Sequence, residues 1–365
     1  MFFSGRPHGG NLEQASRRYK RPKEEFLDFS SNINPLGPSP MALSAISSNL
    51  AAIVNYPDPD CTELKSLLSA HLGLREEYLV IGNGAAELIY SLAQAARIKK
   101  AVIPVPTFIE YGLAVNNCGG EVLEINMPVG NGFCLPLDEI IGHLKGADAL
   151  FLCNPNNPTG RLFPGRVVDQ LVRQALEKGV AVIVDEAFMD FVLSRHCHSV
   201  MGMVGKYPNL IVLYSMTKFF GIPGLRLGAM AGPVELIEVV KTVRAPWTVN
   251  TLAQLAGVAS LKDIRYMQET RKIVVREKKF LYKQLSKIPG IKPLPPAANF
   301  ILIDVRKSGF TSSQITDALG ERGILVRDCE GFAGLDSGGY IRIAVRTRAE
   351  NEKLLYELKN ALEGE

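Results

Sequence analysis

The sequence predicts an α/β fold, in which a parallel sheet is covered by helices and followed by a smaller α+β part. Short apolar segments rich in β-branched residues alternate with amphipathic segments through the middle of the chain. The apolar segments lack polar alternation, which is typical of parallel strands buried on both faces. A long amphipathic segment then leads to further strand and helix patterns near the C-terminus. Strand–helix alternation of this kind indicates a parallel sheet.

Four buried strands are expected in the middle of the chain, at 99–105, 149–155, 179–188 and 210–218. The segment GRVVDQLVRQALEKG between two of them has an apolar stripe at helical spacing, which predicts an amphipathic helix. Earlier, EYLVIGNGAAELIYSLA runs from an apolar stretch through a glycine turn into a helical pattern.

The C-terminal part is expected to begin with a long helix at 265–287. NFILIDV and YIRIAVR have the composition of strands, and RAENEKLLYELKNALEG that of a final helix. We therefore expect a large domain at 36–260 and a small domain at 261–365, with an N-terminal arm at 1–35 that belongs to the small domain.

The composition of the 365-residue chain is ordinary for a soluble globular protein, with 47% hydrophobic and 21% charged residues. Its net charge of +4 is too small to indicate a nucleic-acid or membrane partner. The sequence has no apolar stretch of signal-peptide or membrane-spanning length. Its six cysteines form no CxxC pair, so we expect a reducing, cytoplasmic location and no metal site.

Two further segments invite an interpretation as binding sites. HCH at 196–198 is interpreted as a polar loop, because adjacent side chains rarely converge on one ion. The basic stretch at 17–25, RRYKRPKEE, soon includes acidic residues and is interpreted as a solvated helix face.

Polar residues follow the predicted strands at the point where each strand ends. They are Asn157, Asp185 and Lys218, with Arg226 eight positions further on. In an open α/β sheet, ligands bind beyond the carboxyl ends of the strands. The GNGAA turn at 82–86 adds backbone N–H groups that suit a phosphate. Singly, each feature is more typical of a turn, a loop or a helix cap, but together they supply a phosphate site, an amide, a carboxylate and an amine.

This set resembles the pyridoxal-phosphate (PLP) enzymes of fold type I, the aspartate-aminotransferase superfamily. The resemblance covers nearly the whole chain, and it implies a mostly parallel seven-stranded sheet between helices plus a smaller α+β domain. It implies catalytic roles for three residues. Lys218 would bind the cofactor covalently, Asp185 would pair with its pyridine nitrogen, and Asn157 would hydrogen-bond its phenolic oxygen. A lysine among apolar groups has a lowered pKa, so its amine is a better nucleophile.

The resemblance implies further cofactor contacts. The cofactor phosphate would be held by Gly84, Ala85, Ser215 and Arg226. Phe108, in PVPTFIEYG, matches the aromatic residue that stacks on the cofactor ring. Tyr56, in NYPDPD, matches a tyrosine that comes from the neighbouring subunit, which implies a homodimer.

Within this fold, the sequence is similar to histidinol-phosphate aminotransferases and threonine-phosphate decarboxylases. Three features favour the decarboxylases: HGGN at 8–11, Phe188 in place of the usual aminotransferase tyrosine, and APWTVN. The expected reaction is decarboxylation of L-threonine O-3-phosphate to (R)-1-amino-2-propanol phosphate in cobalamin biosynthesis. Histidinol-phosphate transamination and phosphoserine decarboxylation remain alternatives. A non-catalytic PLP-binding module is a third, and the intact Lys218, Asp185 and Asn157 argue against it.

Arginines near the C-terminus exceed what one carboxylate needs, so we expect a substrate with both a carboxylate and a phosphate. Arg342 matches the carboxylate arginine of the fold and would hold the substrate carboxylate. The phosphate would contact His8, Asn32, Arg327 and Arg346, and Asn11 is expected near the substrate on the same N-terminal arm.

Overall fold

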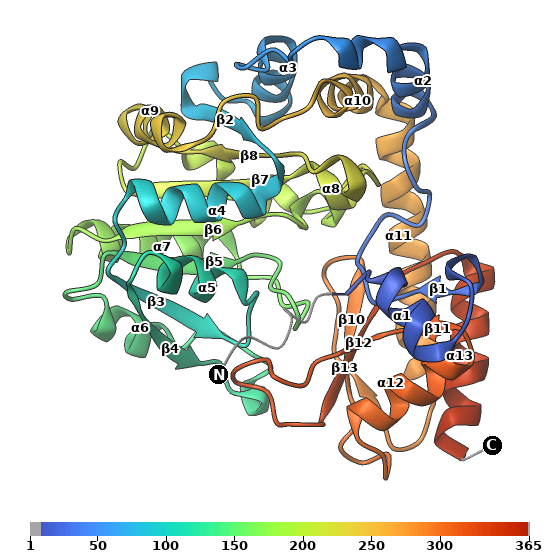
Figure 1. The fold of residues 1–365 in the computed structure, drawn as a ribbon. Helices are drawn as coiled ribbons and strands as arrows, with labels where there is room; N and C mark the ends of the chain where they lie inside the picture. Colours follow the sequence, from blue (N-terminus) through green and yellow to red (C-terminus); the bar gives the residue numbers. More distant parts are fainter. Residues whose placement is uncertain (1–8, 364–365) are drawn as a thin grey trace.

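A seven-stranded sheet forms the main body of residues 9–363, which are the residues that the computed structural model describes. The strand order is β2-β8-β7-β6-β5-β3-β4, and only β8 within this sheet runs antiparallel to its neighbours (Figure 1). This arrangement confirms the predicted mostly parallel sheet. Its strands are β2 (Leu79–Gly82), β3 (Lys100–Val105), β4 (Glu121–Asn126), β5 (Ala149–Cys153), β6 (Ala181–Asp185), β7 (Leu210–Ser215) and β8 (Gly228–Ala231).

Helices cover both faces of this sheet because its central strands are apolar on both sides. One face packs against α4 (Gly84–Ala95), α5 (Glu110–Asn117) and α9 (Val234–Val243). The other face packs against α3 (Thr62–Leu72), α6 (Leu137–His143) and α7 (Gly165–Leu176). Two apolar cores therefore enclose the sheet, one on each side.

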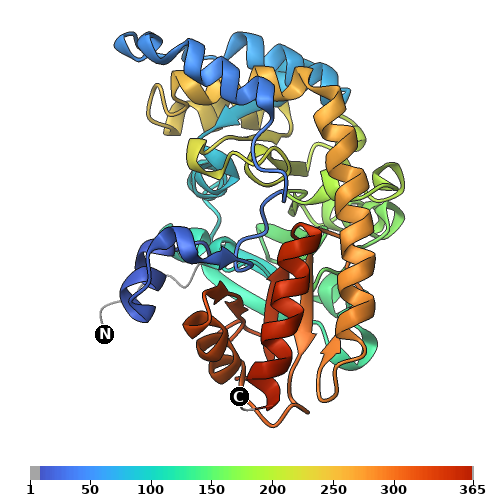
Figure 2. The ribbon, with the colours of Figure 1, turned by 90° about the vertical axis from the view of Figure 1, so that its right-hand side faces the viewer.

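Three other helices connect or flank the main sheet. The short helix α8 (Met216–Phe219) follows β7 directly, and α10 (Thr251–Lys262) packs on α2 (Pro40–Ser48). The long helix α11 (Ile264–Leu285) starts beside α10 and runs along one side of the molecule to the C-terminal part (Figure 2). Its bounds agree with the helix predicted at 265–287.

A second, antiparallel sheet forms the C-terminal part, with the order β12-β13-β10-β9. It consists of β9 (Lys292–Pro293), β10 (Phe300–Asp304), β12 (Arg327–Asp328) and β13 (Tyr340–Ala344). It shares a separate apolar core with α12 (Ser312–Glu321) and α13 (Arg348–Glu363). The strands and the final helix predicted for this region are present.

The N-terminal segment packs on this C-terminal part. Strand β1 (Leu27–Asp28) pairs in parallel with β11 (Ile324–Leu325), and α1 (Leu12–Tyr19) contacts α12. In Figure 1 these segments lie side by side although they are far apart in sequence. The packing agrees with an arm that belongs to the small domain, while the boundaries at 35 and 260 stay a prediction.

The basic stretch at 17–25 is not one helix face, so that prediction was wrong. Helix α1 ends at Tyr19, Lys20 is left-handed, and a 3₁₀ turn, η1, occupies Lys23–Glu25. Pro22 has no N–H to continue the helix. The remaining 3₁₀ turns are η2 (Leu50–Val54), η3 (Glu76–Tyr78), η4 (Val129–Asn131), η5 (Met189–Phe191), η6 (Arg195–Cys197), η7 (Met201–Met203) and η8 (Pro223–Leu225).

The HCH segment lies in and just after η6. Among residues 9–363, no group of three or more His, Cys, Asp or Glu side chains is placed to hold a metal ion. Within the same range, no helix combines the length and apolar character needed to cross a membrane.

Candidate active site

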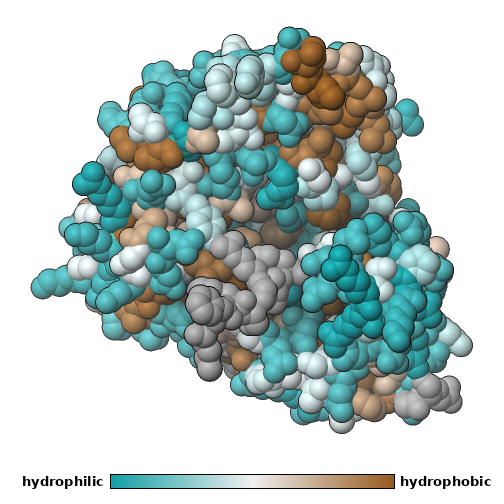
Figure 3. Space-filling view, in the orientation of Figure 1, coloured by the Kyte–Doolittle hydropathy of each residue, from teal (hydrophilic) through white to brown (hydrophobic). Residues whose placement is uncertain are grey.

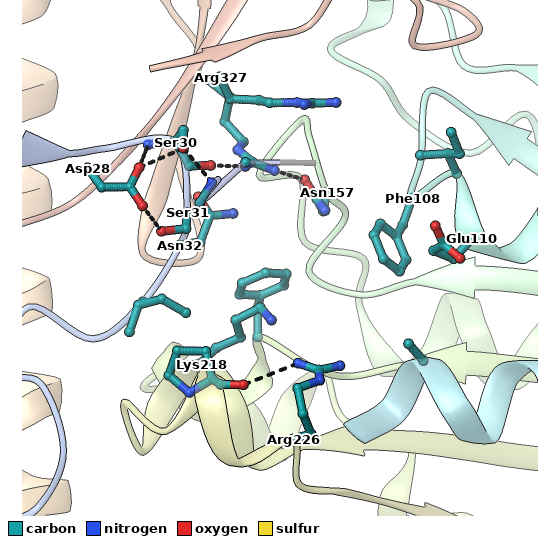
Figure 4. Close-up of a pocket in the computed structure, with 18 of the residues that line it drawn as sticks. Asp28, Ser30, Ser31, Asn32, Phe108, Glu110, Asn157, Lys218, Arg226 and Arg327 are labelled. Atoms are coloured by element: carbon teal, nitrogen blue, oxygen red, sulfur yellow. Dashed lines mark hydrogen bonds between the residues drawn. The ribbon is translucent and has the colours of Figure 1, made fainter. Parts of the chain in front are cut away.

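The carboxyl ends of β5, β6 and β7 meet at one edge of the large sheet, and a cavity of about 700 Å³ opens there. Asn157, Lys218 and Arg226 line this cavity, together with Phe108 (Figure 4). A deeper recess of about 110 Å³ shares these four residues and adds Asp185. Ala85 and Ser215 also line the recess. The structure therefore brings most of the predicted cofactor residues to one place.

Lys218 lies in the short helix α8 immediately after β7, with its amine in the recess. Burial, and then the nearby positive charge of Arg226, lower the pKa of Lys218 to about 8. The amine donates a hydrogen bond to Thr217 Oγ1 at 3.0 Å. Because the neutral amine is the nucleophilic form, Lys218 is prepared to react near neutral pH.

Asp185 is the last residue of β6, and its carboxylate is buried. One oxygen accepts a hydrogen bond from Tyr111 Oη at 2.7 Å, and the other accepts from the Ala187 N–H at 2.9 Å. Burial raises the pKa of Asp185, although both hydrogen bonds and the charge of Lys218 oppose this effect. The carboxylate is thus held in one orientation beside the recess.

Helix α4 and Arg226 form a site for an anion at the other end of the recess. The first N–H groups of α4 have no partner within the helix, and they carry the positive end of its dipole. Gly84 begins this helix with a φ of +80°, and a Cβ there would lie 2.7 Å from Nη2 of Arg226. The glycine therefore leaves room for the guanidinium beside the helix N-terminus. Among the described residues, Arg226 donates a hydrogen bond to the carbonyl oxygen of Pro223 at 3.4 Å and forms no ion pair with a carboxylate.

Two buried arginines lie in the outer part of the cavity. Arg342, only 6% exposed, donates hydrogen bonds to Asn157 Oδ1 and, at 2.7 Å, to the carbonyl oxygen of Ser30. Burial is the main reason that the pKa of Arg342 falls to about 10. Arg327, 9% exposed, lies 5.4 Å from the ring centroid of Phe332. Burial also lowers the pKa of Arg327.

Neither arginine is paired with a carboxylate in residues 9–363. Burying an unpaired charge is costly, and an anionic ligand would offset that cost. The pair Arg327 and Arg342 is thus suited to a ligand with negative charge.

The N-terminal segment supplies another wall of the cavity, where Asn32 lies near Asp28, Ser30 and Ser31 (Figure 4). Asn32 is buried, and its Oδ1 has no hydrogen-bond partner among the described residues. This placement agrees with a substrate contact. His8 lies outside the described residues.

The predicted site residues Asn11, Arg346 and Tyr56 line neither the cavity nor the recess. Asn11 instead caps α1 by accepting a hydrogen bond from the Gln14 N–H at 3.0 Å. Arg346 pairs with Glu350 at 2.6 Å and donates to the carbonyl oxygen of Asp28, so its geometry does not support a phosphate contact. Tyr56 is 81% exposed and stacks on Trp247 with ring centroids 4.7 Å apart, away from the cavity of its own chain.

Sequence reasoning did not identify Tyr111 or Ser30 as site residues. Tyr111 follows Phe108 by three residues, the spacing that places two side chains on one face of a helical turn. This spacing from a predicted cofactor contact could have indicated that Tyr111 lies close to the site. Ser30 acts through its backbone carbonyl, which no residue-type pattern indicates.

The residues present fit PLP as the expected cofactor. The site at α4 and Arg226 suits its phosphate, the Asp185 carboxylate suits its ring nitrogen, and the Lys218 amine suits its aldehyde. Phe108 and Phe188 bring aromatic rings to the space between these groups. All these groups border one recess, as a single bound molecule requires.

Comparison with known proteins agrees with this site. A model of the family "Aminotransferase class I and II" matches residues 24–358. The threonine-phosphate decarboxylase of Salmonella typhimurium is 34% identical, over 98% of this chain and 97% of its own. The histidinol-phosphate aminotransferase of Moorella thermoacetica is also 34% identical, over 93% of this chain and 86% of its own.

A solved structure shows the same fold. The L-threonine-O-3-phosphate decarboxylase of Porphyromonas gingivalis aligns with a TM-score of 0.80 and 27% identity, over 92% of this chain and 99% of that one. Because sequence identity is the same for relatives with two different reactions, it does not decide between decarboxylation and transamination.

Proposed function

The chain belongs to the class I and II aminotransferases, a family of fold type I PLP-dependent enzymes, and on that premise we propose that it decarboxylates L-threonine O-3-phosphate. The products would be carbon dioxide and (R)-1-amino-2-propanol phosphate, an amino alcohol of the kind that cobalamin biosynthesis consumes. Decarboxylation of O-phospho-L-serine and transamination of histidinol phosphate are the competing reactions.

The pair of buried arginines, Arg327 and Arg342, is the observation that supports this proposal most. Both line one cavity with Lys218, and neither has a carboxylate partner within residues 9–363. Phosphothreonine carries a carboxylate and a phosphate on one small molecule. Histidinol phosphate has a phosphate but no carboxylate, so an aminotransferase would bind the phosphate of this amino donor first and a carboxylate only later, on the amino acceptor. A decarboxylase needs both anion sites at once.

The cavity walls suggest how the substrate is held. Arg342 donates a hydrogen bond to Asn157, which borders the recess, and this contact supports a role for Arg342 in binding the carboxylate beside the reacting carbon. Arg327 and Asn32 line only the outer cavity and suit the phosphate. With both ends fixed, the bond from the α-carbon to the carboxylate is held in one orientation, which determines that this bond breaks.

The reacting groups lie on the inner side of the substrate. PLP supplies the electron sink that stabilises negative charge on the substrate α-carbon. With PLP bound, Asp185 would keep a proton on the ring nitrogen, because its buried carboxylate needs a positive partner. Lys218, which lines the recess, would donate the proton that replaces the carboxylate on the α-carbon.

The surface around α2 and η2 supports a homodimer. Exposed apolar side chains gather there, and Figure 3 shows them as brown atoms over the upper right of the molecule. They include Leu50, Ile53 and Val54, and Tyr56 follows them in the chain. A second copy of this chain would cover them, and Tyr56 would then reach the cavity of the partner subunit.

Two truncated ligands test the assignment of the arginines. Threonine lacks the phosphate, and 1-amino-2-propanol phosphate lacks the carboxylate. Arg342→Lys should weaken threonine binding, whereas Arg327→Lys should weaken binding of the amino alcohol phosphate. Loss of one charge-assisted hydrogen bond corresponds to roughly 10-fold to 100-fold in affinity.

The control for these variants is Arg173→Lys. Arg173 lies on α7 and pairs with Asp169 at the surface, outside the cavity. It should leave the affinity for both ligands unchanged. The proposal fails if neither cavity variant weakens binding of phosphothreonine itself.

A further inference from the structure

We propose that Tyr111 is a positioning residue for the cofactor, which acts by fixing the carboxylate of Asp185 and the ring of Phe108. Tyr111 lies on α5 beneath the recess and does not border it. It would therefore act on the cofactor only through these two neighbours.

Packing contacts hold the side chain of Tyr111 in one position. Its ring stacks on Phe151 with centroids 5.4 Å apart, and it meets the Phe108 ring edge-on at 5.6 Å. No part of the side chain is exposed to solvent. From this position the hydroxyl donates to Asp185 Oδ2 at 2.7 Å.

This hydrogen bond helps to fix the orientation of the Asp185 carboxylate. Asp185 Oδ2 accepts from Tyr111, while Oδ1 accepts from the backbone of Ala187. Without the hydroxyl, one oxygen of a buried carboxylate would lose its hydrogen-bond donor, which is costly. The carboxylate would then turn or take up a proton, and either change weakens its contact with a protonated ring nitrogen.

The local sequence explains why one residue serves both neighbours. Phe108 and Tyr111 are three residues apart in PTFIEYG, where the chain leaves β3 and starts α5. Asp185 ends β6, and β5 lies between β3 and β6 in the sheet. From the start of α5, the Tyr111 side chain therefore reaches past Phe151 of β5 to Asp185 at the end of β6.

Tyr111→Phe tests the proposal, because it removes the hydroxyl and keeps the ring packing. The dissociation constant for PLP, measured by visible absorption on cofactor-free protein, should rise roughly 10-fold to 100-fold. The ratio of the absorption bands of bound PLP should also change. The matched control is Tyr207→Phe, which removes another tyrosine–aspartate hydrogen bond of 2.7 Å, to Asp169, where neither residue lines the cavity or the recess. It should leave both measurements unchanged.

A double-mutant cycle shows whether Tyr111 acts through Asp185. In an Asp185→Asn background, Tyr111→Phe should change PLP affinity less than about threefold, because the charged acceptor is already gone. The proposal is overturned if Tyr111→Phe alone leaves PLP affinity and spectrum unchanged, or if its effect is equally large in both backgrounds. Unchanged PLP affinity in Asp185→Asn alone would overturn it as well, and would locate the error in the role of Asp185.

Discussion

At the scale of single residues, the charge state of Lys218 follows from its surroundings. Burial and Arg226 lower its pKa to about 8, against about 10.4 for an unperturbed lysine. Between these values the unfolded chain binds the proton and the folded chain does not. The stability contribution of this group therefore rises as pH rises from about 8 to about 10.4.

We predict that a small amine-acetylating reagent modifies Lys218 of the cofactor-free protein with a midpoint near pH 8. In urea-unfolded protein the midpoint should move to about 10.4. Peptide mass spectrometry measures the modification of this one residue. Arg226→Gln should raise the midpoint of the folded protein, since it removes a positive charge beside the amine. A midpoint that is the same in folded and unfolded protein would contradict this explanation.

The site residues differ in how well their sequence context predicts them. Asp185 ends a buried strand, Asn157 and Lys218 follow two others, and the ends of neighbouring parallel strands must meet at one edge. Arg346 also follows a strand, but Glu350 lies four residues further on, within reach of its guanidinium. An ion pair with a nearby residue occupies the guanidinium, so the arginine is not available to a ligand. The spacing of residues along the strand does not indicate such a pair.

At the scale of elements, the predicted strands were those with apolar residues on both faces. Strands β4 and β8 were not predicted. Most side chains of β4 are at least partly exposed, as expected at the sheet edge, and β8 is the short sequence GAMA. Neither has the composition of a buried strand. Pairing with apolar neighbours holds both in the sheet: β4 pairs with β3, and β8 pairs with β7 and with β2, which is itself an apolar stretch.

The start of α4 gives a prediction for the phosphate site. Gly84→Ala should weaken PLP binding roughly tenfold, because its Cβ would displace the Arg226 guanidinium from the helix N-terminus. Gly73→Ala is the matched control, since Gly73 has a similar φ of +69° but open space around its Cβ position. Both variants should lose about 1–2 kcal/mol of stability from left-handed backbone strain. Equal PLP affinity in the two variants would argue against the phosphate site.

At the scale of the whole molecule, the proposed homodimer would use two chains for each complete site. Tyr56→Ala and Lys218→Ala proteins should each be nearly inactive as homodimers. Mixed under conditions that exchange subunits, they form heterodimers with one intact site, containing Lys218 of one chain and Tyr56 of the other. An equal mixture should recover about a quarter of wild-type activity, since half of the dimers are mixed and each has one site of two. No recovery despite exchange, followed by mass spectrometry, would contradict a shared site.

The most direct measurement of the proposed reaction compares two substrates on the PLP-loaded protein. Phosphothreonine labelled in its carboxylate should release one labelled carbon dioxide for each amino alcohol phosphate formed. Histidinol phosphate, supplied with 2-oxoglutarate, should give keto product with a kcat/KM lower by roughly 100-fold or more, because it leaves the buried carboxylate arginine unpaired. Keto product from histidinol phosphate, with no carbon dioxide from phosphothreonine or phosphoserine, would contradict the assignment as a decarboxylase.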